Sequence, residues 1–134
     1  MVRLGVKQDR IVILTQYRLQ RAQIKDRLKK ANMKDILVST VKTSQGKEWD
    51  YVILSTVRSL PRVEIDEKAS TAWKIRNLGF ITDENQINVA ITRPKMGLII
   101  LGNKYLLSVH RTWKLLLAHY EEKGALVNAK DFLP

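Results

Sequence analysis

The sequence contains no cysteine, which excludes disulfide bridges and thiolate metal sites. The two histidines, His110 and His119, have no carboxylate pattern near them, so we predict helix-surface residues and no metal site. No apolar run approaches the roughly 18 residues that cross a bilayer, and the first residues lack a signal-peptide core. We therefore expect an intracellular protein, in the nucleus or the cytoplasm, with no membrane partner.

Acidic residues are scarce relative to basic ones. Lysine and arginine together number 24 against 13 aspartates and glutamates, which gives a net charge of +11 and a pI near 10.1. This excess favours a polyanionic partner such as nucleic acid, although solubility alone could explain part of it. A chain of 134 residues with 45% hydrophobic composition predicts one domain, residues 1–134, with one core.

The hydrophobic pattern predicts an α/β fold. Short apolar runs rich in β-branched residues predict buried strands at residues 11–14, 36–41, 51–57 and 98–101. Apolar residues at helical spacing separate some of these runs. Strands that alternate with helices favour a mostly parallel sheet with helices on both faces, in three layers.

The helical segments differ in character. Residues 19–31 predict a strongly basic helix with Ala22, Ile24 and Leu28 on its apolar face. Residues 105–124 predict one long amphipathic helix in which Trp113 and Tyr120 are packed rather than exposed to bind bases. Between strands, residues 58–78 show no periodicity and predict a partly ordered excursion, anchored on the core by Trp73. Residues 125–134 predict a tail.

A third helix, from Asp83 to Arg93, stands before the last strand. Asp83 can cap it, Gln86 occupies the reciprocal capping position, and Ile87, Ala90 and Ile91 form an apolar face. Arg93 projects at the helix end, because Pro94 disfavours further helix. An arginine fixed there can reach across a cleft, or it can simply be a solvated surface residue.

Two further stretches could contact a phosphate. Residues 15–21 follow the first strand, where open α/β sheets bind ligands, so Arg21 is a candidate phosphate contact or one more basic residue on a solvated helix. The loop Gln45-Gly46-Lys47-Glu48 lies between two predicted strands. Its glycine could bring backbone amides close to a phosphate, and its carboxylate could accept hydrogen bonds from ribose hydroxyls. A glycine in an ordinary turn is the alternative.

Together these segments resemble a known family. In order, they are similar to motifs IV, V and VI of superfamily 1 helicases: Thr15 to Arg21, Val38 to Arg58, and Gly79 to Asn103 with Asn88-Val89-Ala90-Ile91-Thr92-Arg93. The match covers most of residues 10 to 103 and points to the up-frameshift-like branch, with the RNA helicase of nonsense-mediated decay and the helicases with zinc-finger domains. More narrowly, we expect a helicase with zinc finger domain.

The resemblance implies the second RecA-like domain of a two-domain motor that closes onto ATP and Mg²⁺, both held mainly by the first domain. By match to motifs IV and VI, Arg21 would contact the γ-phosphate and Arg93 would be the arginine finger. By match to motif V, Gln45 would lie near the γ-phosphate, Gly46 would approach the nucleotide and Glu48 would hold its ribose. Tyr17, in motif IV, would also contact the nucleotide.

The same match implies partners. Thr43, Ser44 and Arg58 would face the track of single-stranded RNA or DNA. The first RecA-like domain of the same parent chain is a second partner, and protein cofactors are a third. The chain has no Gly-Xaa4-Gly-Lys-[Ser/Thr] loop, so we expect a fragment that neither hydrolyses ATP nor unwinds a duplex alone.

Four positions depart from the family pattern. Lys42 replaces an aspartate, Asn85 and Gln86 replace a basic pair, and Pro94 replaces an alanine. Three hypotheses therefore stay open. The parent is an ATP-driven helicase, or a catalytically weakened helicase-like module kept for nucleic-acid or protein binding, or the chain is an unrelated doubly wound α/β module whose charge serves solubility.

Overall fold

The computed structural model describes residues 1–132, and its contacts divide them into two compact units. The first unit comprises Met1–Arg58 and Phe80–Gly102, and the second comprises Ser59–Gly79 and the chain from Asn103 onward. The assignment of all residues to one RecA-like domain stays a prediction. Within the described residues, no helix is both long and apolar enough to cross a membrane.

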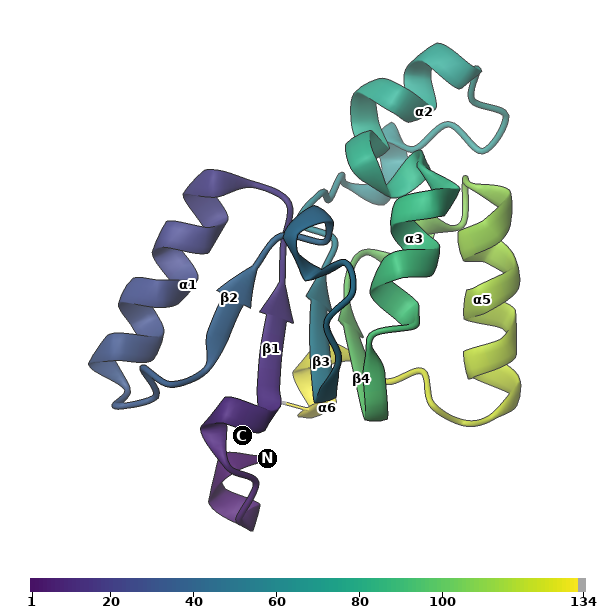
Figure 1. Ribbon diagram of the computed structural model, residues 1–134. Coiled ribbons are helices and arrows are strands. Elements are labelled where there is room, and N and C mark those ends of the chain that lie inside the picture. Colours follow the sequence, from purple (N-terminus) through teal and green to yellow (C-terminus); the bar gives the residue numbers. More distant parts are fainter. Residues whose placement is uncertain (133–134) are drawn as a thin grey trace. The chain divides into compact units, whose positions relative to one another are not determined.

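The first unit contains a four-stranded sheet in the order β2-β1-β3-β4, and every pairing is parallel (Figure 1). The strands are β1 (Ile11–Leu14), β2 (Leu37–Ser39), β3 (Trp49–Ser55) and β4 (Pro94–Leu101). This confirms the predicted α/β class with a parallel sheet. The boundaries shift: β3 lies two residues earlier than predicted, and β4 begins four residues earlier.

The early start of β4 has a simple cause. Proline has a φ angle that suits an extended chain, and the backbone amide of Trp49 donates to the carbonyl of Arg93, 3.2 Å away. Pro94 can therefore begin β4 opposite Trp49, in register with the start of β3. The central strands β1 and β3 are the best buried part of the sheet, with Val12 beside Val52 and Leu14 beside Leu54, all at most 1% exposed.

The strand order defines one special position. From β1 the chain passes through α1 (Arg18–Lys30) to β2 on one side, whereas from β3 it passes through α3 (Glu84–Ile91) to β4 on the other side. The direction of the connections therefore reverses between β1 and β3. In open α/β sheets this switch point, at the carboxyl ends of the strands, is where ligands bind.

Helix α1 is attached to the sheet lightly. None of its residues is fully buried: Ile24 and Leu28 are half-buried as predicted, but Ala22 is exposed. The inward row is instead Gln20, Ile24 and Leu28, at i, i+4 and i+8, and Ala22 lies about 160° from Ile24 around the helix axis. The prediction for Ala22 is wrong because Gln20, a polar residue, takes the inward position.

The second unit consists of helices: α2 (Thr71–Leu78), α4 (Lys104–Leu107), α5 (Arg111–Glu122) and α6 (Ala129–Phe132). Thus the excursion at 58–78 contains a helix capped by Ser70, and Trp73 is half-buried within it. A short helix, α6, lies in the predicted tail, whose last two residues are outside the described range. Trp113 is 1% exposed, which confirms its packing, and burial raises the pKa of the Tyr120 phenol above its ordinary value.

The prediction of a single long helix from residue 105 to 124 is wrong. The structure has two helices there, α4 and α5, separated by residues 108–110. The Ser108 hydroxyl donates to the Lys104 carbonyl, 2.5 Å away, and the amide of Val109 donates to the Leu106 carbonyl in a tighter turn. A serine that bonds to the backbone competes with regular helix. Hydrophobic spacing continues across the break, so periodicity alone could not reveal it.

A glycine in β4 gives the first testable prediction. A Cβ atom added to Gly97 would lie 3.0 Å from Cδ1 and 3.3 Å from Cε1 of Tyr51 in the neighbouring strand. We expect Gly97→Ala to lower the free energy of unfolding by about 1–2 kcal/mol, because the crowded ring must move. Urea denaturation measures this. The double variant Gly97→Ala with Tyr51→Leu should recover the loss, and an unchanged midpoint for Gly97→Ala alone would contradict the packing.

Candidate functional site

Two predicted site residues meet at the switch point. Tyr17 follows β1 and Arg58 follows β3, and Arg58 Nε donates to the Tyr17 hydroxyl at 2.9 Å. The Arg58 guanidinium also lies over the Tyr17 ring, 5.0 Å from its centroid, while Phe80 packs its ring at a steep angle against Tyr17 with centroids 5.9 Å apart. The structure thus joins a residue predicted to bind nucleotide to one predicted to face nucleic acid.

A strained turn places Arg58 there. Val57 has a φ angle of 66°, and the Arg58 amide donates to the Thr56 carbonyl at 2.7 Å, which closes a three-residue turn. A positive φ at a β-branched residue costs about 1–3 kcal/mol and persists only where the surroundings enforce it. Here Thr56 is fully buried, and its amide and hydroxyl both donate to the Leu101 carbonyl, at 3.0 and 3.2 Å.

A polar network that sequence reasoning missed supports the same edge. The Thr15 hydroxyl donates to Gln20 Oε1, and Gln20 Nε2 donates to the Ser55 hydroxyl at 3.1 Å. Gln20 therefore connects α1 to the ends of β1 and β3. Its position in the row with Ile24 and Leu28 is a signal that could have identified it as an inward polar residue.

Arg21 follows Gln20 in the first turn of α1 and is half-buried. No carboxylate in the described part of the chain forms an ion pair with it. The helix begins at Arg18, its N-cap residue Tyr17 forms no side-chain capping bond, and its first turn has no acidic residue, so the surroundings of Arg21 are electropositive. This environment suits an anion. The backbone amide of Arg21 donates to the Tyr17 carbonyl at 3.0 Å, but in the described residues no side-chain hydrogen bond connects Arg21 with another site residue.

Thr43 and Ser44 lie in the 3-10 helix η3 (Lys42–Ser44), which follows β2 and packs against α3. The Thr43 hydroxyl is exposed and lies 2.6 Å from the Ser39 hydroxyl and 2.8 Å from that of Thr40. Ser44 is different, because it is fully buried and its hydroxyl donates to the Val41 carbonyl at 2.6 Å. In this conformation Thr43 faces outward and Ser44 holds the turn together.

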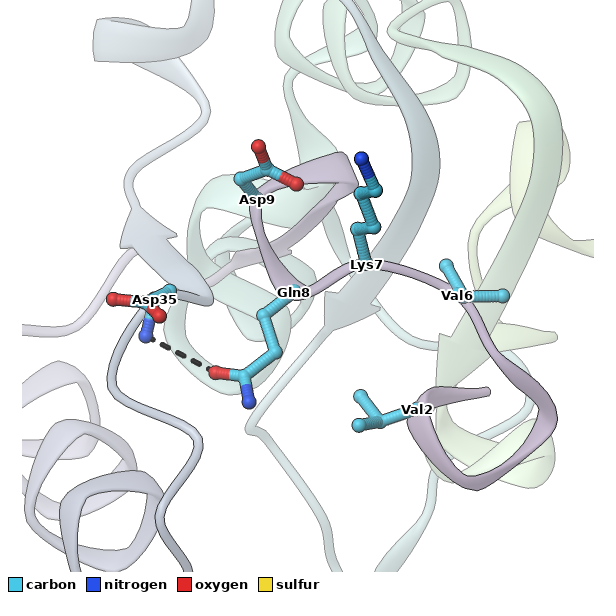
Figure 2. A pocket seen from close by; sticks show the side chains of 6 residues that line it. All are labelled: Val2, Val6, Lys7, Gln8, Asp9 and Asp35. Carbon is cyan, nitrogen blue, oxygen red and sulfur yellow. Dashed lines mark hydrogen bonds between the residues drawn. The ribbon is translucent and has the colours of Figure 1, made fainter.

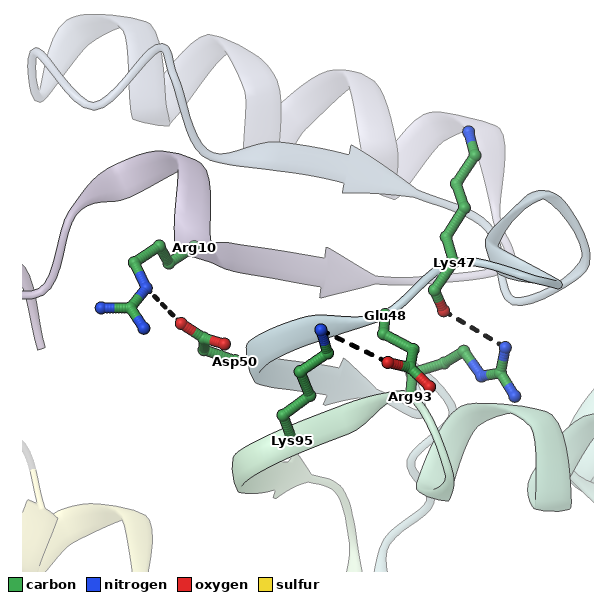
Figure 3. Close-up of polar contacts among 6 residues, drawn as sticks. All are labelled: Arg10, Lys47, Glu48, Asp50, Arg93 and Lys95. Carbon is green, nitrogen blue, oxygen red and sulfur yellow. Dashed lines mark hydrogen bonds and ion pairs between the residues drawn. The ribbon is translucent and has the colours of Figure 1, made fainter.

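The loop after η3 carries the next three predicted residues, Gln45, Gly46 and Glu48, and all are exposed. Gly46 has a φ angle of 73°, which favours glycine, and a Cβ at this position would meet no atom within 4 Å. Space above Gly46 is what a close approach of a ligand requires. The Glu48 carboxylate is engaged, since Lys95 Nζ lies 3.4 Å from its Oε2 (Figure 3).

Arg93 ties this loop to α3. One terminal nitrogen donates to the Lys47 carbonyl at 3.2 Å (Figure 3). Arg93 Nε donates to the Val89 carbonyl at 3.0 Å, and the other terminal nitrogen donates to the Thr92 hydroxyl at 3.1 Å. A guanidinium has five N–H groups, so two remain beyond these three bonds. Lys47 lies between Gly46 and Glu48, and the predicted motif V and motif VI residues are therefore adjacent.

Asp83 caps helix α3 as predicted, because its carboxylate accepts from the amides of Asn85 and Gln86 at 3.0 and 3.3 Å. The predicted reciprocal cap is wrong, because the Gln86 side chain does not return to the Asp83 backbone. Its Nε2 donates to the Asp83 carboxylate at 3.3 Å, and its Oε1 accepts from Gln16 at 3.0 Å. This second bond connects α3 to the segment beside Tyr17, so α3 contacts both groups of site residues.

A separate hollow of about 690 Å³ lies near the start of the chain, lined by Val2, Val6, Lys7, Gln8, Asp9 and Asp35 (Figure 2). Gln8 contacts the backbone there, accepting from the Asp35 amide at 3.2 Å. None of the predicted site residues lines this hollow. Among residues 1–132, no three histidine, aspartate or glutamate side chains converge to hold a metal ion.

Comparison with known proteins identifies the family. A family model described as an AAA domain matches residues 1–105, so the chain belongs to that family. The human 3'-5' exoribonuclease HELZ2 is 37% identical over 124 residues, which cover 92% of this chain and 4% of that protein. The ATP-dependent helicase NAM7 of Saccharomyces cerevisiae is 37% identical over 129 residues, covering 92% of this chain and 12% of that protein.

Regulator of nonsense transcripts 1 of Dictyostelium discoideum is 38% identical over 130 residues, covering 92% of this chain and 9% of that protein. Within its family the chain is therefore a superfamily 1 helicase domain of the up-frameshift-like branch, with an α/β RecA-like fold. The identities to HELZ2 and to the nonsense-transcript regulators are alike and do not separate the two groups. The chain spans 4% to 12% of the lengths of these relatives.

The Tyr17–Arg58 contact yields a prediction. Tyr17→Phe removes the hydroxyl that orients Arg58 but keeps the ring, and we expect about fivefold weaker binding of single-stranded nucleic acid, equivalent to about 1 kcal/mol for one hydrogen bond. Fluorescence anisotropy measures it. The matched control is Tyr105→Phe, because Arg62 also lies over that ring, 4.4 Å from its centroid. If Arg58→Gln weakens binding while Tyr17→Phe does not, the orienting role is wrong.

Proposed function

We propose that this chain is the second RecA-like domain of an ATP-dependent helicase and supplies motifs IV, V and VI to an ATP site shared with a first RecA-like domain. The observation that carries the proposal is the contact of Arg93 with the Lys47 carbonyl at 3.2 Å. It brings the end of the motif VI helix against the motif V loop, as a shared phosphate site requires. The names of the relatives, among them ATP-dependent helicase NAM7, support the same assignment.

In this proposal Arg93 is the arginine finger. Its Nε and two terminal nitrogens are fixed by protein oxygens, which reduces the entropy cost of orienting it, and two N–H groups remain for negative charge that develops on a transferred phosphoryl group. Lysine would not substitute, because a single ammonium cannot span the same acceptors as a planar fork.

The remaining nucleotide contacts come from two segments. Arg21 would reach the γ-phosphate from the first turn of α1, where no acidic residue opposes an anion. Gln45 would lie near the γ-phosphate, Gly46 would let the backbone approach the nucleotide, and Glu48 would accept from ribose hydroxyls. Tyr17 would contact the nucleotide through the part of its ring that Arg58 and Phe80 leave open.

Nucleic acid would bind near the carboxyl ends of the strands. Arg58 and Thr43, both exposed, would contact phosphates, which give affinity without sequence readout, while the buried Ser44 would shape the turn that presents Thr43. The partners are then single-stranded RNA or DNA, the first RecA-like domain of the parent chain, and protein cofactors. Mg²⁺ and most of the ATP contacts belong to the first domain, so the 134-residue chain alone would not turn over ATP.

The function is tested by ATP turnover of a parent protein that contains both RecA-like domains, with saturating single-stranded nucleic acid. Arg93→Ala is expected to lower kcat about a thousandfold, the usual range for loss of an arginine finger, and Arg93→Lys should lose nearly as much. Nucleic-acid affinity should stay unchanged.

The control for Arg93 is Arg76→Ala, which removes an exposed arginine from the last turn of α2 in the second unit. It should leave turnover unchanged. Wild-type turnover that Arg93→Ala does not reduce would refute the finger, and absence of wild-type turnover would refute the motor.

A second candidate is a catalytically weakened module kept for binding. One observation favours it: Lys95 forms an ion pair with the Glu48 carboxylate, so the proposed ribose acceptor already has a partner. Lys42, Asn85, Gln86 and Pro94 also depart from the family pattern. In place of the family's basic pair, Gln86 forms a neutral hydrogen bond with Gln16, and this lowers the positive charge beside the switch point.

Glu48 provides the experiment that separates the two candidates. If Glu48 holds the ribose, the two-domain protein should bind ATP about fivefold more tightly than 2′,3′-dideoxy-ATP, a difference of about one hydrogen bond. Lys95→Gln should widen that difference by releasing the carboxylate, and Glu48→Gln should narrow it. Equal affinities for both nucleotides in all three proteins, measured by calorimetry, would favour the binding module.

A further inference from the structure

Helix α1 carries a row of positively charged side chains that are not part of the candidate site. Arg18, Lys25 and Lys29 stand at i, i+7 and i+11, so they lie within about 40° of one another around the helix, and the row is about 16 Å long. All three are exposed, and we call them the α1 basic row. Ala22, which is exposed and has a short side chain, lies between Arg18 and Lys25 on the same side of the helix.

Acidic residues of the described chain do not neutralise the row. The three ion pairs found there involve Arg10, Lys30 and Lys95, and none includes a member of the row. The single acid on α1, Asp26, is paired with Lys30 at 2.7 Å. The row therefore presents three uncompensated positive charges on one exposed line.

The row also weakens its own helix. Lys25 and Lys29 are like charges four residues apart, which destabilises a helix by about 0.2–0.5 kcal/mol. Arg18 in the first turn opposes the helix dipole, whereas Lys29 in the last turn complements it. Yet α1 buries no residue fully and exposes 82% of Leu19, so its packing offers little compensation. A bound polyanion would relieve the repulsion.

We propose that the α1 basic row is an accessory binding surface for the phosphate backbone of a single-stranded nucleic acid. The row starts beside Tyr17, whose hydroxyl holds Arg58, and runs along α1 away from the carboxyl ends of the strands. A strand that contacts Arg58 can continue along it.

The chemistry of the row favours a nucleic acid over other polyanions. On their line around the helix the three members have no apolar residue except the small Ala22, and the exposed Leu19 lies about 80–120° away. The row can therefore bind phosphates without selecting bases. A membrane surface would require larger apolar side chains on the same line. This surface is independent of ATP turnover, because it includes neither Arg21 nor Arg93.

The test compares two triple variants of the 134-residue chain. One is Arg18→Gln, Lys25→Gln and Lys29→Gln, and the other is Lys68→Gln, Lys114→Gln and Lys123→Gln, three exposed lysines of the second unit. Each lowers the net charge from +11 to +8, so the variants differ only in where charge is removed. Glutamine keeps a good helix propensity, and circular dichroism checks folding.

Binding of labelled polyuridine is measured by anisotropy across a salt series. Each phosphate contact contributes a slope of about 0.7 in log affinity against log salt for a single strand, so the row variant should lose about 2 from the slope and tenfold to a hundredfold in affinity at low salt. The second-unit variant should bind as the wild type does. Swapping Arg18 to Lys, and Lys25 and Lys29 to Arg, should preserve binding.

Four results would overturn the proposal. Equal losses in the two triple variants would mean that total charge matters and the row does not. Equal losses toward labelled polyglutamate would show an unselective anion surface. If the row variant binds polyuridine as tightly as the wild type while Arg58→Gln binds it more weakly, nucleic acid binds only at the carboxyl ends of the strands. If the glutamine variant unfolds, failure of the charge-preserving variant to bind would equally refute the proposal.

Discussion

The contact between the Arg93 side chain and the Lys47 carbonyl is the interaction on which the proposed site depends. It connects the segment just after α3 to an exposed loop that has few other attachments, while the Arg93 carbonyl accepts from the Trp49 amide and aligns the starts of β3 and β4. Through its other end α3 reaches Gln16 beside Tyr17. One short helix therefore connects the proposed motif V loop, the proposed arginine finger and the edge of the sheet.

Backbone strain at Val57 positions a second site residue, Arg58, at the switch point. Val57 holds a positive φ that its β-branched side chain disfavours, and the buried Thr56 and its two bonds to Leu101 maintain it. The result is that Arg58 stands against Tyr17. Gln20 stiffens the same edge by connecting Thr15 to Ser55. These contacts make the carboxyl ends of β1 and β3 a preorganised surface, which lowers the ordering cost of binding.

Much of the fold could be predicted from local pattern. Buried parallel strands have continuous apolar runs rich in β-branched residues, so β1 and β3 could be predicted. The capping residue Asp83 indicated where α3 starts. The break at Ser108 could not be predicted, because apolar spacing runs through it and a side-chain hydrogen bond decides it. The prediction for Ala22 was wrong for a related reason. Periodicity assigns apolar residues to the buried face, but Gln20 takes that position because it bonds to Ser55, which is distant in sequence.

The candidate site was predictable only as a set of residues. Motif order named Arg21, Gly46 and Arg93, yet the bond of Arg93 to Lys47 spans 46 residues of sequence, and the pairing of Tyr17 with Arg58 spans 41. Such contacts follow from strand order, which no local pattern contains. The ion pair of Lys95 with Glu48 was likewise invisible, because nothing in the sequence indicates which of many lysines lies near one carboxylate.

The most direct measurement is a crystal structure of the two-domain protein with ADP, Mg²⁺ and a phosphoryl-transfer analogue such as aluminium fluoride. We expect a terminal nitrogen of Arg93 about 2.7–3.1 Å from the analogue, with the Val89 carbonyl still accepting from Nε. An Arg93 side chain that points away from the analogue in a closed complex would contradict the claim that this domain completes the ATP site.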